Sequence, residues 1–81
     1  MDVIFYGRLA DRVGRQVHLS VPGGGCTVAE LRQRIAEEHP TIADDLLGPA
    51  VRACVADEIV PESAIVSADQ SVEFFPPVSG G

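Results

Sequence analysis

The sequence predicts an α+β domain in which a mixed sheet of four or five strands packs on one long helix. Segments with strand-like alternation lie at both ends of the chain, and a single long amphipathic segment lies between them. The 81 residues suffice for one domain. A composition of 46% hydrophobic and 22% charged residues is that of an ordinary globular protein.

The first strand is predicted over residues 2–6, which are rich in β-branched and aromatic side chains. Because side chains alternate along a strand, Val3 and Phe5 should point to one face and Ile4 and Tyr6 to the other. Both faces are apolar. This pattern suits a central strand, or a strand whose outer face meets a partner.

A loop and a second strand should follow. Residues 7–14 are expected to form a loop that Leu9 and Val13 hold against the core. Residues 16–21 then alternate as the second strand of a hairpin. The side chains predicted to face inward are Val17, Leu19 and Val21.

One helix has clear start and stop signals. Pro22 and the three glycines at 23–25 break the preceding strand, and no Lys-Ser/Thr follows them as in a phosphate-binding loop. Thr27 and Glu30 have the spacing of a capping box, and Pro40 should end the helix near Glu38. Its apolar stripe is Val28, Leu31 and Ile35.

The segment after this helix should be mainly β. Residues 41–47 are expected to form a short helix or turn, with Ile42 and either Leu46 or Leu47 on the core. Strands are predicted around 51–55 and at 59–60, with Asp57-Glu58 as the turn between them. Ile65 and Val66 are assigned to a loop.

The last strand is predicted at 71–75, with Val72 and Phe74 facing inward and Glu73 and Phe75 outward. Two strands, a helix and two or three further strands resemble the order of the β-grasp, or ubiquitin-like, architecture. We therefore expect a β-grasp domain over residues 1–75 and an extended tail over residues 76–81.

Charge and cysteine content narrow the classes of function. The net charge is −6, and all six basic residues are arginines, so nucleic-acid binding is disfavoured and a basic protein partner is favoured. No apolar run approaches the ~20 residues of a membrane span, so we expect a cytoplasmic protein. Cys26 and Cys54 form no CxxC pair and are expected to be buried and unreactive.

The C-terminal tail is the most informative segment. Pro76 and Pro77 cannot continue a strand and favour a stiff, extended chain. The residues after Phe75 then reach at most about 20 Å. Gly80 and Gly81 have no side chains, so they can enter a narrow channel and present a carboxylate there. An ionised carboxylate is a poor electrophile, so another protein must activate it.

The terminal sequence Phe-Phe-Pro-Pro-Val-Ser-Gly-Gly resembles the end of the MoaD branch of the MoaD/ThiS family, the small subunits of molybdopterin synthase. The Phe5-Tyr6-Gly7 strand, the Thr27-Val28 helix start and the chain length agree with this resemblance. It covers essentially the whole chain, and the terminal eight residues are its most specific part.

The resemblance implies a sulfur carrier that binds no cofactor and is not an enzyme by itself. An adenylyltransferase similar to MoeB would use ATP to adenylate Gly81, and a sulfur donor protein would convert the adenylate to a thiocarboxylate. The tail would then enter a large subunit similar to MoaE, in a heterotetramer, and deliver sulfur to cyclic pyranopterin monophosphate. Gly80 would fit the channel, and Val78 and Ser79 would line its mouth.

The body of the chain offers no obvious catalytic group. His18 and His39 are interpreted as surface residues. Phe75, Tyr6 and Ile4 should instead form an apolar patch at the root of the tail, suited to a partner interface. The alternative is that another layer of the same domain covers these three side chains.

Three other functions stay open. A carrier for thiamine synthesis would share the fold and the Gly-Gly end, although such chains are usually shorter and lack the Phe-Phe-Pro-Pro segment. A ubiquitin-like modifier would join Gly81 to lysines of other proteins by amide bonds. A β-grasp interaction module would do neither, and its Gly-Gly end would be incidental.

Overall fold

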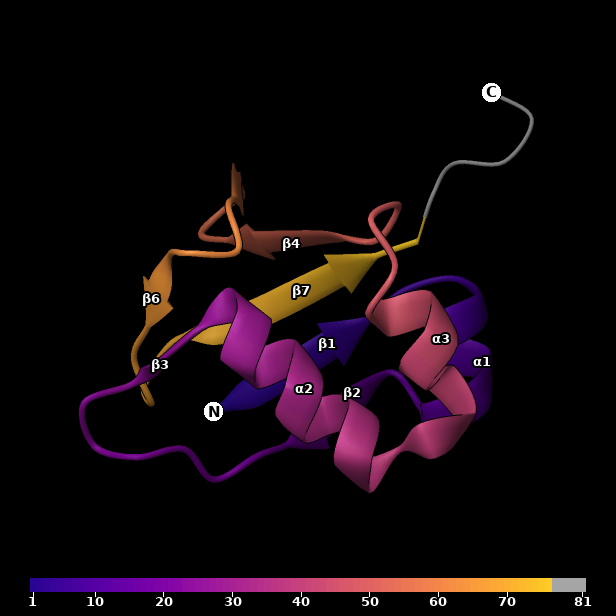
Figure 1. The fold of residues 1–81 in the computed structure, drawn as a ribbon, viewed down its shortest axis with the longest axis horizontal. Helices are drawn as coiled ribbons and strands as arrows, with labels where there is room; N and C mark the ends of the chain where they lie inside the picture. The colour runs from indigo at the N-terminus through magenta and orange to yellow at the C-terminus, as the bar shows by residue number, and fades with distance from the viewer. Residues whose placement is uncertain (77–81) are drawn as a thin grey trace.

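The computed structural model describes residues 1–76. Pro77, Val78, Ser79, Gly80 and Gly81 lie outside the described residues. Figure 1 shows the arrangement of the elements. In chain order they are β1 (Asp2–Phe5), α1 (Arg8–Val13), β2 (Gln16–His18), β3 (Cys26–Thr27), α2 (Val28–Glu38), the 3₁₀ turn η1 (Pro40–Ile42), α3 (Ala43–Leu46), β4 (Arg52–Val55), β5 (Glu58–Val60), β6 (Ile65–Val66) and β7 (Ser71–Phe75).

Five strands form one mixed sheet in the order β2-β1-β7-β4-β5. The central strand, β7, runs parallel to β1, and the other neighbouring pairs are antiparallel. α2 crosses one face of this sheet, and the short ribbon of β3 and β6 lies at one end (Figure 1). The predicted β-grasp architecture, with a five-stranded sheet packed on one main helix, is confirmed.

The core lies between the sheet and α2, as the alternation predicts. Phe5 of β1 and Phe74 of β7 are fully buried, and their ring centroids lie 6.0 Å apart. The capping box is present: the Thr27 side chain accepts a hydrogen bond from the Glu30 amide, and the Glu30 carboxylate accepts one from the Thr27 amide. The buried face of α2 includes Val28, Leu31 and Ile35. Ile42 and Leu46 are also buried, while Leu47 is exposed.

The prediction of a loop at 7–14 is wrong. Arg8–Val13 forms α1, which buries Leu9, and glycines with positive φ flank it at both ends. Six residues are too few to show a helical period, and the flanking glycines resemble loop punctuation. The second strand is also shorter than predicted and ends at His18, although Leu19 is buried as expected.

Two β features differ from the prediction. Cys26–Thr27 pairs with Ile65–Val66, which was assigned to a loop, and two-residue strands are too short to show alternation. The hairpin turn between β4 and β5 lies at Ala56 and Asp57, whose φ angles are 52° and 67°, and Glu58 already belongs to β5. Such turns favour Asn-Gly, so Ala-Asp carries only a weak signal.

Arg32 is a buried charge that connects α2 to the chain before β4. Its Nη1 donates to the Leu46 carbonyl at 2.6 Å and its Nη2 to the Val51 carbonyl at 2.7 Å. Its Nε lies 2.9 Å from a carboxylate oxygen of Glu62, and its guanidinium lies 5.2 Å from the centroid of the Phe74 ring. Arg32 therefore holds both ends of the 46–51 segment and contacts the last strand.

Gly7 allows the start of the tail to lie against the turn between β1 and α1. Its φ is +60°, and a Cβ built there would lie 2.8 Å from Cγ of Pro76. A side chain at this position would therefore need both a strained backbone and a displaced proline. Gly14, at the other end of α1, also has a positive φ but has no atom within 4 Å of such a Cβ.

We predict that Arg32→Ala lowers the free energy of unfolding by about 2–5 kcal/mol, because it leaves two buried carbonyls without donors. Urea denaturation measures this change. Arg34 lies on the same helix as Arg32 and makes one exposed hydrogen bond, to the Ser20 carbonyl. Arg34→Ala should therefore lower the free energy of unfolding by less than about 1 kcal/mol. Equal losses for the two variants would contradict the role given to Arg32.

We predict that Gly7→Ala is more destabilising than Gly14→Ala, and that it alone moves the start of the tail. Both variants place a side chain at a residue with positive φ, and this backbone strain lowers the stability of each by about 1–3 kcal/mol. Only Gly7→Ala adds the contact with Pro76. Thermal unfolding and the amide shifts of residues 74–75 in NMR spectra measure the two effects. Unchanged shifts in Gly7→Ala would show that Pro76 does not depend on Gly7.

Candidate functional site

The site begins with the parallel pairing of β1 and β7. In this register Phe5 lies opposite Phe74, so the two strands end side by side. At the ends of the two strands Tyr6 lies against Phe75, and just beyond them Gly7 lies against Pro76. The members of each pair are far apart in sequence. The tail therefore follows the central strand of the sheet, which has β1 on one side and β4 on the other.

Tyr6 and Phe75 form an aromatic pair on the outer face of the sheet. Their ring centroids lie 4.5 Å apart and the rings are nearly parallel, at 4°. The Tyr6 hydroxyl donates to Oε2 of Glu73 at 2.5 Å, and this hydrogen bond raises the pKa of Tyr6. Tyr6 is 36% and Phe75 37% exposed, so no second layer within residues 1–76 covers them.

Ile4 lies on the same face as this pair but is half-buried. It pairs with Glu73 of β7 and with Gln16 of β2. The structure thus brings together the three residues predicted to form an apolar patch. Their use as a partner interface stays a prediction.

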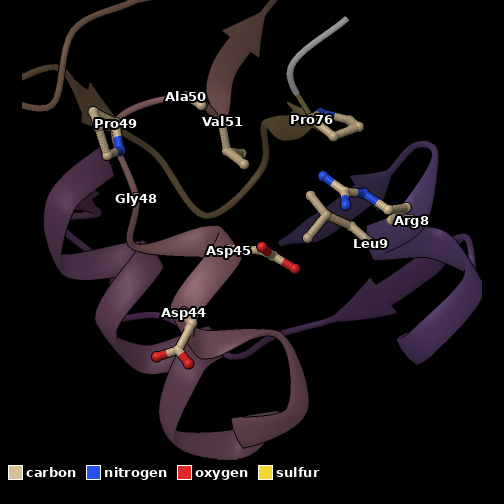
Figure 2. A pocket seen from close by; sticks show the side chains of 9 residues that line it. All are labelled: Arg8, Leu9, Asp44, Asp45, Gly48, Pro49, Ala50, Val51 and Pro76. Atoms are coloured by element: carbon tan, nitrogen blue, oxygen red, sulfur yellow. The ribbon is translucent and has the colours of Figure 1, made fainter. Parts of the chain in front are cut away.

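A pocket of about 140 Å³ lies on the other side of the root, bounded by α1, α3, the 48–51 segment and Pro76 (Figure 2). Leu9 and Val51 form part of its wall, and Arg8 and Asp45 lie at its edge. Sequence reasoning missed this pocket because it assigned α1 to a loop. The Gly48-Pro49 pair, which forces a turn, was the one available signal.

Of the predicted tail residues, the structure places Pro76 alone. Gly81, the predicted site of chemistry, lies outside the described residues, as do Gly80, Ser79, Val78 and Pro77. Pro76 is half-buried, contacts the Gly7 position and lines the pocket. β7 ends at Phe75, and the division into a domain over residues 1–75 and a tail over residues 76–81 stays a prediction.

The cysteines and histidines are the remaining candidates for chemistry among residues 1–76. Cys26 and Cys54 are free and buried, as predicted, and burial raises the pKa of both thiols. His18 is exposed and lies 3.0 Å from Asp2, whose pKa it lowers. His39 is the C-cap of α2. No group of three or more potential metal ligands occurs among these residues.

None of the helices within residues 1–76 has the length and apolar composition needed to cross a membrane. What the described geometry provides is a rigid support for the tail, with an exposed aromatic pair on one side of its root and a pocket on the other. Such an arrangement can present a chain end to another protein.

Solved structures with the same fold support this description. The small archaeal modifier protein SAMP1 of Haloferax volcanii aligns with a TM-score of 0.81 at 24% identity, covering 99% of this chain and 97% of its own. A Pyrococcus furiosus protein provisionally assigned as molybdopterin converting factor, subunit 1, aligns with a TM-score of 0.81 at 20% identity, covering 95% of each chain. At these identities the likeness shows the fold alone.

Comparison by sequence with curated proteins yields no match. The family comparison is more informative, because the pattern of the ThiS family matches residues 3–81, nearly the whole chain. The match runs through the tail as well as the β-grasp domain. The chain therefore belongs to the ThiS family of ubiquitin-like sulfur carriers, the family whose MoaD branch its terminal residues resemble.

Proposed function

We propose that this chain is the sulfur carrier subunit of molybdopterin synthase and acts in the cytoplasm. The observation that carries the proposal is the terminal sequence Phe-Phe-Pro-Pro-Val-Ser-Gly-Gly, whose two phenylalanines are the last residues of β7. Family membership supports a carrier, and the fold shared with the Pyrococcus furiosus protein is consistent with the molybdopterin branch.

In the proposed reaction the chain is the substrate of its partners. The Gly81 carboxylate attacks ATP on a MoeB-like adenylyltransferase, pyrophosphate leaves, and an acyl-adenylate forms. A sulfur donor protein then supplies sulfur at the sulfide level, which attacks the carbonyl carbon and displaces AMP, so that the thiocarboxylate forms without a change of oxidation state. A thiocarboxylate is ionised near neutral pH and nucleophilic at sulfur, so it can deliver sulfur to cyclic pyranopterin monophosphate.

The partners supply the chemistry that residues 1–76 lack. A MoaE-like large subunit would hold the tail in a channel, with Gly80 passing the narrowest part and Val78 and Ser79 at the mouth. The patch of Ile4, Tyr6 and Phe75 would lie against this subunit in a heterotetramer. Stacked, exposed aromatic rings lose little conformational entropy on binding and are typical interface anchors.

Protein modification is a second candidate, because the fold matches that of an archaeal protein named as a modifier. A modifier would form an amide between Gly81 and a lysine of another protein. A carrier for thiamine synthesis is a third candidate within the same family. The Phe-Phe-Pro-Pro segment favours the molybdopterin branch over it.

We predict that incubation with the adenylyltransferase, ATP and a sulfur source adds to the chain the mass difference between sulfur and oxygen. Intact-mass spectrometry measures this change. A variant without Gly81 should fold normally, as judged by circular dichroism, and gain no mass. Attachment of the chain to other proteins without sulfur gain would favour a modifier, and no adenylate or thiocarboxylate at all would contradict the sulfur-carrier proposal.

We predict that Phe75→Ala weakens binding to the large subunit by about tenfold or more, because it removes half of the aromatic pair. Calorimetric titration of the large subunit with each variant measures this loss. Ile65→Ala is the matched control, since Ile65 is exposed but belongs to the separate β3-β6 ribbon. Equal affinities for Phe75→Ala and Ile65→Ala would show that the patch is not an interface.

A further inference from the structure

The pocket beside Pro76 has no role in the function proposed above. Leu9 and Val51 in its wall are almost fully buried, and both side chains point into the space below Pro76 (Figure 2). Pro49 and Ala50 add further apolar surface. The volume of about 140 Å³ compares with the roughly 150 Å³ of a cavity that binds benzene. One leucine-sized side chain or one aromatic ring would fill it.

The walls of this pocket are held in place before anything binds. If the 46–51 segment moved, the Arg32 guanidinium would lose its hydrogen bond to the carbonyl of Leu46 or of Val51. Gly7 lets Pro76 close the opposite side. A preformed pocket costs little ordering free energy on binding. These contacts distinguish it from a chance gap between surface loops.

The charges at the pocket favour a cationic neighbour for its occupant. Asp44 and Asp45 of α3 both belong to the lining. The Asp45 carboxylate points toward Arg8 and Leu9, whereas the Asp44 carboxylate points away from them (Figure 2). Neither carboxylate forms an ion pair within residues 1–76. Arg8 is the single cation in the lining, and the chain as a whole carries a charge of −6. A positive side chain of a partner would therefore be attracted here.

We propose that this pocket is a second docking site for the protein that holds the tail. It takes one leucine- or phenylalanine-like side chain of that protein, with a lysine or arginine of the same protein beside the acidic residues of α3. Pro76 is both the first residue of the tail and a wall of the pocket, so a protein that encloses the tail also reaches the pocket. This inference rests on the proposed function for the identity of that protein.

Filling the pocket tests the apolar part of the inference. Ala50 lines the pocket and is exposed, so Ala50→Trp can occupy the space without disturbing the core. Calorimetric titrations use the purified large subunit, which holds the tail in the function proposed above. We expect it to bind Ala50→Trp about tenfold or more weakly. Ala29→Trp, at an exposed position of α2, should bind it within about twofold of the wild type.

Neutral variants test the charged part and keep the fold. Replacing Asp44 and Asp45 together by Asn should weaken the same complex about three- to tenfold at low ionic strength, and the difference should shrink as salt is added. Asp57→Asn, in the hairpin turn between β4 and β5, is the control and should have no such effect. Amide spectra of each variant verify that it is folded.

Two outcomes separate this inference from the proposed function. If the wild type gains sulfur and the large subunit binds Ala50→Trp as tightly as Ala29→Trp, the pocket is not a docking site for it and the sulfur-carrier proposal stands. If the wild type neither binds the large subunit nor gains sulfur, both proposals are wrong.

Discussion

The parallel pairing of β1 with β7 is the constraint on which the rest of the structure depends. It places two buried strands at the centre of the sheet, stacks Phe5 on Phe74 inside, and sets Tyr6 against Phe75 outside. It also makes the two strands end together, so the tail starts from a strand that is paired on both sides. A tail that starts at an edge strand would lack this support, because edge strands have a neighbour on one side only.

Much of this fold was predictable because its main elements have long or strongly marked patterns. The alternation in β1 and β7 identified Phe5 and Phe74 as core residues, and the capping box of Thr27 and Glu30 placed the start of α2. The elements that sequence reasoning missed are short: α1, with glycine at both ends, and the two-residue strands β3 and β6. The formation of these elements depends on tertiary contacts, which leave no periodic pattern in the local sequence.

The candidate site also has one part that was predictable from the sequence and one part that was not. The outward positions of Tyr6 and Phe75 followed from strand alternation, and their stacking follows from the register of β1 and β7. The pocket could not be predicted, because it is built from α1, from the 48–51 segment that Arg32 holds, and from Pro76. A buried arginine that donates to two carbonyls leaves no recognisable sequence pattern. The chemistry itself was assigned from the tail, whose residues 77–81 lie beyond those described.

In the proposed function the body of the chain supports the tail, and the reacting atom is the carbonyl carbon of Gly81. The most direct measurement is tandem mass spectrometry of the chain isolated from the cells that make it, with sulfur located to a residue. The account predicts a thiocarboxylate at Gly81 and unmodified Cys26 and Cys54. Sulfur on either cysteine, or a terminus found as a carboxylate or as an amide to another protein, would contradict it.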